Sequence, residues 1–350
     1  MVEKIQQTLR DSAAIRWMVL LFLAFAMFCS YIFMDILSPI KDLMQSTRGW
    51  DSTAFGTMQG SETFLNVFVF FLIFAGIILD KMGVRFTAIL SGIVMLVGAT
   101  INWYAVTESF QGSGLETWFN NNLNYIPGFD ELGISPFYKG MPASAKFAAV
   151  GFMIFGCGVE MAGITVSRGI VKWFKGREMA LAMGSEMALA RLGVATCMIF
   201  SPVFAKLGGH IDVSRSVAFG VVLLFIALIM FIAYFFMDKK LDAQTGEAEE
   251  KDDPFKISDL GKILSSMGFW LVALLCVLYY SAIFPFQKYA VNMLQCNLDF
   301  KSVDPNSFWA TNTVTMIQYC IMLVVDVYKR QLLSRLAQSS NFKFFTASPT

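Results

Sequence analysis

Long runs of mainly apolar residues alternate with short polar segments over most of this chain. A helix that crosses a bilayer needs about 20 predominantly apolar residues. Eight runs are candidate spans: Ile15–Leu37, Ala54–Leu79, Phe86–Val106, Ala145–Val171, Met179–Ala205, Val217–Met237, Phe269–Phe286 and Phe308–Val325. An open strand edge would leave backbone polar groups unsatisfied in lipid, whereas a helix satisfies them internally. The pattern therefore predicts an all-α polytopic membrane protein without an intervening water-soluble domain.

The first run, Ile15–Leu37, is predicted to be a signal anchor and the first span. It is too long for the core of a cleavable signal and lacks a small-residue cleavage site. With the N-terminus inside, Lys and Arg are more numerous in the inner polar segments than in the outer ones. This bias predicts a cytoplasmic N-terminus and places the long segment 107–144 outside.

The composition agrees with a membrane protein, because 56% of the residues are hydrophobic and only 15% are charged. A soluble domain carries roughly 25% charged residues. The net charge of +1 gives no indication of a nucleic-acid partner. No CxxC pair occurs among the six cysteines, and His210 is the only histidine. We therefore expect no metal site, no cofactor and no disulfide framework, and we find no nucleophile–base set typical of an enzyme.

Glu160 and Arg191 are charged residues in neighbouring predicted spans. A charge at the centre of a span costs about 2.5–3.5 kcal/mol on insertion scales, so such residues are candidates for function. Both lie at a similar depth from the loop that joins the two spans, so an antiparallel pair of helices could bring them together. They would form a structural ion pair or hold the two ends of a zwitterion, with Arg191 binding a carboxylate in bidentate fashion.

Asp35 and Asn66 are two further polar residues within predicted spans. Asp35 could line a substrate cavity or couple a proton; the alternative is an interfacial aspartate ahead of the helix-ending Ser38–Pro39. Asn66 is a candidate wall residue of the same cavity, although hydrogen bonding between helices is the commoner role of such a side chain.

A charged turn, Gly76 to Arg85, separates the second and third predicted spans. Gly83 in this turn is free to take a positive φ. The order of glycine, acid, base, glycine and base in this stretch resembles the signature between helices two and three of the major facilitator superfamily. The resemblance implies a cytoplasmic loop in which Gly76, Asp80, Gly83 and Arg85 form a conformational latch for the outward-facing state.

Two other stretches resemble the same superfamily. The loop 172–184 is similar to the pattern between its helices four and five, and the seventh predicted span contains Tyr279 and Tyr280 ahead of Pro285. That span resembles the seventh helix of the lysosomal dipeptide uniporter branch. In that branch an acid and an arginine of helices four and five grip the dipeptide, which implies this role for Glu160 and Arg191, with the two tyrosines nearby.

The resemblance also predicts the organisation of the chain. Residues 1–237 would form a six-helix bundle, 238–265 a charged cytoplasmic linker, and 266–325 the first two helices of a second bundle. About eight of the twelve helices of the major facilitator fold would be present. The hexapeptide 326–331 matches the translation of a transposon sequencing adapter, so residues 326–350 are predicted to be a non-native tail, unless they form a genuine loop after helix eight.

These features predict a transporter that moves a small polar solute by alternating access. Short peptides, above all dipeptides, are the preferred substrates. The lipid bilayer would surround the protein, and coupling of transport to a proton is left open. One alternative is an organic-acid or inorganic anion facilitator in which Arg191 binds the anion. Another is a non-transporting membrane scaffold or receptor. A bacterial plasma membrane is the expected location.

Overall fold

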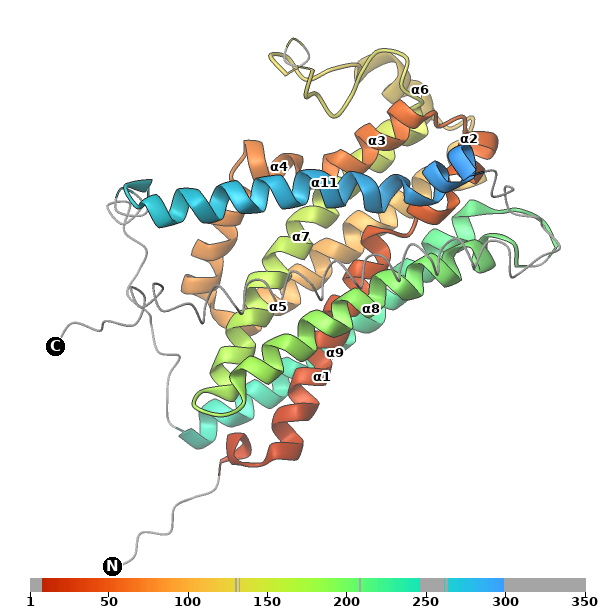
Figure 1. Ribbon diagram of the computed structural model, residues 1–350. Helices are drawn as coiled ribbons and strands as arrows, with labels where there is room; N and C mark the ends of the chain where they lie inside the picture. Colours follow the sequence, from red (N-terminus) through yellow and green to blue (C-terminus); the bar gives the residue numbers. More distant parts are fainter. Residues whose placement is uncertain are drawn as a thin grey trace, which may run out of the picture.

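The computed structural model describes residues 8–129, 131, 133–207, 209–245, 261 and 264–298, and every element in these residues is helical (Figure 1). The elements in chain order are η1 (Leu9–Asp11), α1 (Ala13–Met34), η2 (Ser38–Ile40), α2 (Lys41–Arg48), α3 (Ser52–Gly60), η3 (Ser61–Thr63), α4 (Phe64–Phe68), α5 (Phe71–Val106), η4 (Glu108–Phe110), α6 (Gly114–Asn122), α7 (Ala143–Phe174), α8 (Met179–Ala205), α9 (Val213–Thr245) and α11 (Met267–Leu298). The predicted span Phe308–Val325 and the predicted tail lie outside the described residues.

Six of the described helical segments are long and apolar enough to cross a membrane. They contain α1, α5, α7, α8, α9 and the first part of α11, and they coincide with predicted spans. The prediction of an all-α polytopic membrane protein is therefore confirmed.

The predicted span Ala54–Leu79 is not one continuous helix, which corrects the prediction. The chain forms α3, the short turn η3 and α4, and it then breaks at Phe70, whose φ of 55° lies in the left-handed region. In the polar turn between α3 and α4, the Ser61 hydroxyl donates to the carbonyl oxygens of Met58 at 2.6 Å and Ala149 at 3.0 Å. Such side-chain hydrogen bonds compete with regular helix formation.

The helix labelled α5 changes direction at Gly83, where φ is 79° and ψ is 165°. Its first part completes the second pass through the membrane, and its second part forms the third pass. This conformation is essentially restricted to glycine, because a Cβ would clash with the backbone. The expected positive φ at Gly83 is confirmed.

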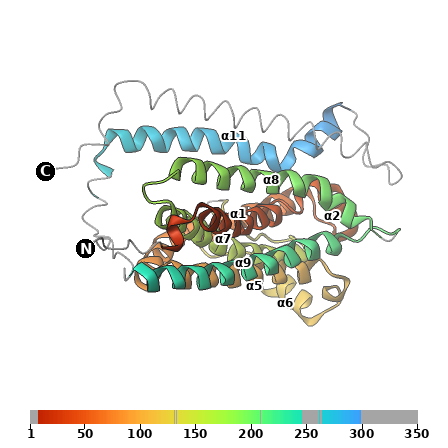
Figure 2. The ribbon, with the colours of Figure 1, turned by 90° about the horizontal axis from the view of Figure 1, so that it is seen from below.

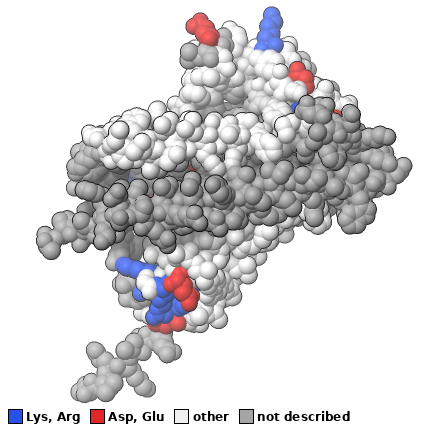
Figure 3. All heavy atoms as spheres, in the orientation of Figure 1, with Lys and Arg blue, Asp and Glu red and all other residues white. Residues whose placement is uncertain are grey.

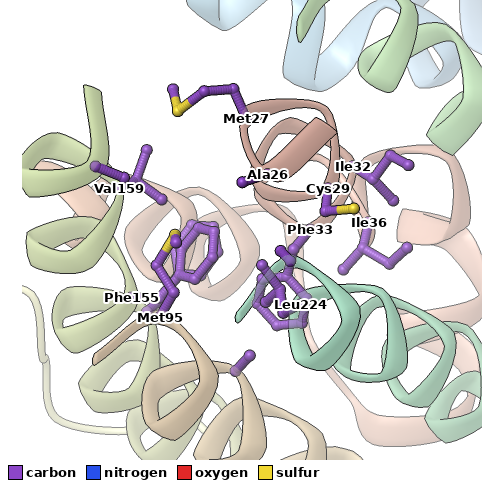
Figure 4. Packing of buried hydrophobic residues seen from close by; sticks show 14 of the residues in the cluster. Ala26, Met27, Cys29, Ile32, Phe33, Ile36, Met95, Phe155, Val159 and Leu224 are labelled. Atoms are coloured by element: carbon purple, nitrogen blue, oxygen red, sulfur yellow. The ribbon is translucent and has the colours of Figure 1, made fainter. Parts of the chain in front are cut away.

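Glycines allow the helices to approach one another closely. A Cβ on Gly98 of α5 would lie 2.5 Å from the carbonyl oxygen of Gly151 of α7, and a Cβ on Gly193 of α8 would lie 2.4 Å from that of Phe28 of α1. Small residues at crossings are a common means of packing helices in membranes. Larger side chains fill the space between these crossings, as Phe33 of α1 and Phe155 of α7 do with ring centroids 4.8 Å apart (Figure 4).

The bundle has two ends, which we define by the segments they contain. The proximal end holds the start of α1, the α7–α8 loop and the end of α9; the distal end holds η2, α2, α3 and α6 (Figure 1). Charged side chains gather at both ends on the face drawn in Figure 3, and the visible described surface between them is largely uncharged. This distribution suits a bundle whose middle is surrounded by lipid.

Helix α11 lies at the edge of the bundle in the view of Figure 2. It contacts the rest of the described chain mainly at η2. Helix α9 continues to Thr245, into the segment for which the sequence predicts a linker beginning at residue 238. Most of the remaining predicted linker lies outside the described residues.

We predict that Gly83→Ala lowers the free energy of unfolding by about 1–3 kcal/mol, because alanine would be strained in this backbone conformation. Thermal unfolding in detergent measures the loss. The matched control is Gly76→Ala, which lies in the same helix with no atom within 4 Å of an added Cβ. The control should unfold at or above the wild-type temperature, and equal loss in both variants would contradict the prediction.

Candidate functional site

Tyr31 of α1 is the point at which three of the predicted site residues converge. The guanidinium carbon of Arg191, from α8, lies 5.6 Å from the centroid of the Tyr31 ring, which is a cation–π geometry. Glu160 of α7 and Tyr280 of α11 lie within electrostatic range of the Tyr31 hydroxyl, and so does Glu186 of α8. The structure therefore gathers an arginine, two carboxylates and two phenols from four helices.

Asp35 forms an ion pair with Lys288 of α11, one turn further along α1 from Tyr31. The Lys288 ammonium lies 2.7 Å from a carboxylate oxygen of Asp35 and donates to the carbonyl oxygen of Met34 at 2.9 Å. The side chains of Asp35 and Lys288 are only 1% and 12% exposed. Ser38 donates a further, longer hydrogen bond of 3.4 Å to Asp35. The predicted cavity residue Asp35 is thus a buried carboxylate held by a cation from the last described helix.

Glu62 connects these two groups of residues. Its carboxylate lies within electrostatic range of Lys288, Asp35 and Glu160. The break in the second crossing positions Glu62, because the turn η3 packs tightly against α7: a Cβ on Gly156 would lie 2.1 Å from the Glu62 carbonyl oxygen. We call the combined set the central polar site, which consists of Tyr31, Asp35, Glu62, Glu160, Glu186, Arg191, Tyr280 and Lys288.

Sequence reasoning missed Glu62, Glu186, Tyr31 and Lys288. A signal was available for the two glutamates, because both lie within predicted spans, where an ionisable residue is by default a candidate for function. Lys288 gave no such signal, because it follows the predicted end of the seventh span at Phe286. Only the length of α11, which continues to Leu298, brings Lys288 inside the bundle.

The remaining predicted site residues are less directly connected. Tyr279 lies edge to face against Tyr280, with ring centroids 5.3 Å apart. Both polar atoms of the Asn66 side chain are buried and have no hydrogen-bond partner among the described residues. Asn66 follows Glu62 by one helical turn in the broken second crossing, which keeps it a candidate wall residue.

The predicted latch residues lie at the proximal end. Asp80 forms an ion pair with Arg168 of α7, and Arg85 pairs with Asp242 of α9 at 2.9 Å. Lys172 of α7 bridges Asp242 at 2.8 Å and Asp238 at 2.7 Å. The turn around Gly83 is thereby connected to the ends of two other helices of the same bundle. Its role as a conformational latch stays a prediction.

Asp238 is the most buried member of this proximal network. Its side chain is fully buried and accepts hydrogen bonds from the Trp173 indole at 2.8 Å and the Tyr234 hydroxyl at 3.3 Å. Arg85 lies 3.9 Å from the same carboxylate. Several donors and cations therefore compensate a charge that would be costly alone.

A further ion pair at the proximal end joins the segment before α1 to the α7–α8 loop. Arg177 lies 2.8 Å from Asp11, which also accepts hydrogen bonds from the backbone N–H and the hydroxyl of Thr8. The Thr8 backbone and hydroxyl hydrogen bonds, helped by Arg177, hold the pKa of Asp11 below its ordinary value. Among the described residues, no group of three or more His, Cys, Asp or Glu side chains is arranged to hold a metal ion.

The family can now be assigned from sequence comparison. The sequence model of the Major Facilitator Superfamily matches residues 23–337. The chain belongs to the major facilitator superfamily. This assignment confirms the resemblance seen in the charged turn and agrees with the helical, multi-pass structure.

The relatives of this superfamily member are transporters of the predicted branch. The chain is 24% identical over 280 residues to the lysosomal dipeptide transporter MFSD1 of Homo sapiens, covering 77% of this chain and 52% of the human protein. The sequence identity to the same transporter from Danio rerio is 25% over 282 residues, with the same coverage of both chains. The identity to the transporter from Gallus gallus is 30% over 145 residues, covering 39% of this chain and 32% of the relative. The chain thus spans about half the length of the first two of these relatives, and the relatives carry transporter names rather than enzyme names.

We predict that Asp238→Asn lowers the free energy of unfolding by about 1–3 kcal/mol, because Lys172 and Arg85 lose a buried charge partner. Unfolding in detergent followed by circular dichroism measures the effect. Asp242→Asn is the matched control, because its side chain is 14% exposed and contacts the same two cations. The control should lose less stability, and an Asp238→Asn variant as stable as the wild type would contradict the compensating role of the network.

Proposed function

We propose that the full-length protein moves a small polar solute across a membrane by alternating access, and that short peptides are its substrates. The observation that carries this proposal is that two residues of neighbouring helices lie near Tyr31: the Arg191 guanidinium lies over its ring, and Glu160 lies within electrostatic range of its hydroxyl. The names of the MFSD1 relatives support the same substrate class.

The chemistry of these two side chains suits a zwitterion. The planar guanidinium of Arg191 can bind a peptide carboxylate through two parallel hydrogen bonds. Glu160 can accept hydrogen bonds from the ammonium group at the other end of the peptide. A ligand that carries both charges would satisfy both side chains at once, which an anion or a cation alone would not.

The charge balance of the central polar site also favours a ligand with an ammonium group. Among the residues that the structure describes, the site contains four carboxylates, Asp35, Glu62, Glu160 and Glu186, and two cations, Arg191 and Lys288. A simple anion would meet repulsion from most of these groups. This is why we place the peptide ahead of the anion facilitator that Arg191 alone would allow.

We further propose that residues 1–237 with the end of α9 form the first half of the transporter and that α11 begins the second half. The two halves would rock about the central polar site, with Asp80 and Arg85 stabilising one closed state. Asp35 and Asn66 would contribute to the wall of the path, and a carboxylate of the site would carry a proton if transport is proton-coupled.

The proposed location is the plasma membrane of a bacterium, with the proximal end in the cytoplasm. Lys81, Lys172 and Arg177 belong to the cations at that end, as the positive-inside rule requires.

We predict that an impermeant maleimide added to intact cells labels Lys139→Cys but not Lys81→Cys in a cysteine-free background. Both side chains are exposed, and they lie at opposite ends of the bundle. Permeabilised cells should label both variants, which controls for reactivity. Labelling of Lys81→Cys alone in intact cells would reverse the proposed orientation.

We predict that Arg191→Ala and Glu160→Gln each reduce the uptake of labelled dipeptides into proteoliposomes by about tenfold or more, because each removes a charged partner of the ligand worth about 1.5–3 kcal/mol. Lys139→Ala, which removes an exposed cation outside the site, should transport like the wild type. The wild type should show saturable uptake that unlabelled dipeptide inhibits.

Two other outcomes would redirect the proposal. Absence of dipeptide uptake, together with organic-anion uptake that depends on Arg191 but not on Glu160, would favour the anion facilitator. Absence of both fluxes in a well-folded protein would favour a scaffold or receptor.

A further inference from the structure

We propose that the segment 107–142, which joins α5 to α7 at the distal end, is a brace that keeps the second pass through the membrane broken and so positions Glu62 for the central polar site. Phe129 is the residue through which this brace contacts the second pass. The inference rests on the proposed function, because it gives Phe129 a positioning role for a site that would bind substrate.

The brace is fixed to the start of α7 by aromatic packing and by a buried cation. The rings of Phe110 and Phe119 contact the ring of Phe147 of α7, with centroids 5.3 and 5.0 Å apart. Lys146 of α7 is 1% exposed, and its ammonium donates to the Asn124 side-chain oxygen at 3.0 Å and to the Phe119 carbonyl oxygen at 3.4 Å. A buried ammonium is costly without such acceptors. The lysine therefore connects the segment firmly to α7.

A turn later in the segment holds the backbone of Phe129 from both sides. Its N–H donates to the Ile126 carbonyl oxygen at 3.0 Å, and its carbonyl oxygen accepts from the Ile134 N–H at 3.1 Å. The Ser135 hydroxyl closes the turn, because it accepts from the Ile126 N–H at 3.2 Å and donates to the Phe137 carbonyl oxygen at 2.7 Å. The Phe129 side chain thus projects from a turn with a defined hydrogen-bond pattern.

The ring of Phe129 packs against both ends of α4. Its centroid lies 5.3 Å from that of Phe64 and 5.2 Å from that of Phe68, both edge to face, and the two α4 rings lie 4.9 Å apart. Aromatic pairs of this geometry contribute more than burial alone. Phe68 lies two residues before Phe70, which has the left-handed backbone that separates α4 from α5. The three rings therefore stabilise α4 as a separate short helix beside a strained residue.

Glu62 lies in sequence between two anchored residues of the second pass. Before it, the Ser61 hydroxyl donates to the Ala149 carbonyl oxygen of α7 at 3.0 Å. After it, Phe64 is held by Phe129 and is only 8% exposed. These two anchors fix the backbone that carries Glu62. Loss of the Phe129 ring should let α4 shift, and the Glu62 carboxylate should then leave its place in the central polar site.

The first measurement is hydrogen–deuterium exchange, followed by mass spectrometry, on the full-length protein in lipid nanodiscs without substrate. Phe129→Ala should speed the exchange of the backbone amides of residues 61–70 by about tenfold, because local opening becomes easier, and should leave those of α9 unchanged. Phe129→Leu, which keeps an apolar side chain, should give a smaller change in the same direction. The matched control is Tyr125→Ala, which removes a 55% exposed ring from the same segment and should exchange like the wild type.

The second measurement tests whether Phe129 acts through Glu62. In proteoliposomes, Phe129→Ala should raise the dipeptide concentration that gives half-maximal uptake by about fivefold, as expected for coupled residues. The same substitution should have no effect on this concentration when Glu62→Gln is already present. Phe129→Tyr, which keeps the ring, should restore the wild-type value. A purely structural loss would act equally in both backgrounds.

The outcomes separate this inference from the proposed function. Unchanged exchange in residues 61–70 of Phe129→Ala, or equally fast exchange in Tyr125→Ala, would overturn the brace. An equal effect of Phe129→Ala on uptake with Glu62 present or replaced would overturn the positioning role. If the wild type takes up no dipeptide, the proposed function fails, and the exchange comparison alone decides the brace. Thermal unfolding of each variant ensures that only folded protein enters the comparison.

Discussion

A charge inside an apolar helix bundle is tolerated only where an opposite charge or several hydrogen-bond donors compensate it. Two almost fully buried aspartates, Asp35 and Asp238, show this constraint at the two ends of the molecule. Asp238 is compensated within one bundle, by α5, α7 and the end of α9. Asp35 is compensated by α11. The same physical requirement thus produces a fixed network at the proximal end and, at the distal end, a contact between two separable parts.

Close helix packing is the second condition for the central polar site. Gly98 and Gly151 bring α5 and α7 together, and Gly193 brings α8 against α1. The Gly193 contact holds α8 and α1, which bear Arg191 and Tyr31, at short range from each other, and the α5–α7 contact packs the helix that bears Glu160 into the bundle. The carboxylates of Glu160 and Glu186 and the guanidinium of Arg191 therefore converge on one tyrosine without any long loop.

The helical break in the second pass through the membrane positions Glu62 for the central polar site, at a local energetic cost. Phe70 has a left-handed backbone conformation, which is unfavourable by about 1–3 kcal/mol for a residue other than glycine. A continuous helix from Ala54 to Leu79 would carry Glu62 on a different path. In the interrupted segment, η3 packs against Gly156 and Glu62 lies within electrostatic range of Lys288, Asp35 and Glu160. Strain of this kind is common where backbone geometry serves a function.

The sequence by itself determined the helical class, the membrane location, the spans within the described residues apart from the broken second one, and the turn at Gly83. These properties are local, because the bilayer acts on each segment of about 20 residues and a turn depends on the conformational freedom of single residues. It also indicated Glu160 and Arg191, since a charge in a span is visible without a fold. Only the tertiary structure decided that Tyr31 lies near both, that Glu62 turns inward and that Lys288 reaches Asp35. These contacts depend on how each helix is rotated, broken and packed against residues far away in the chain, and hydropathy carries no information about that.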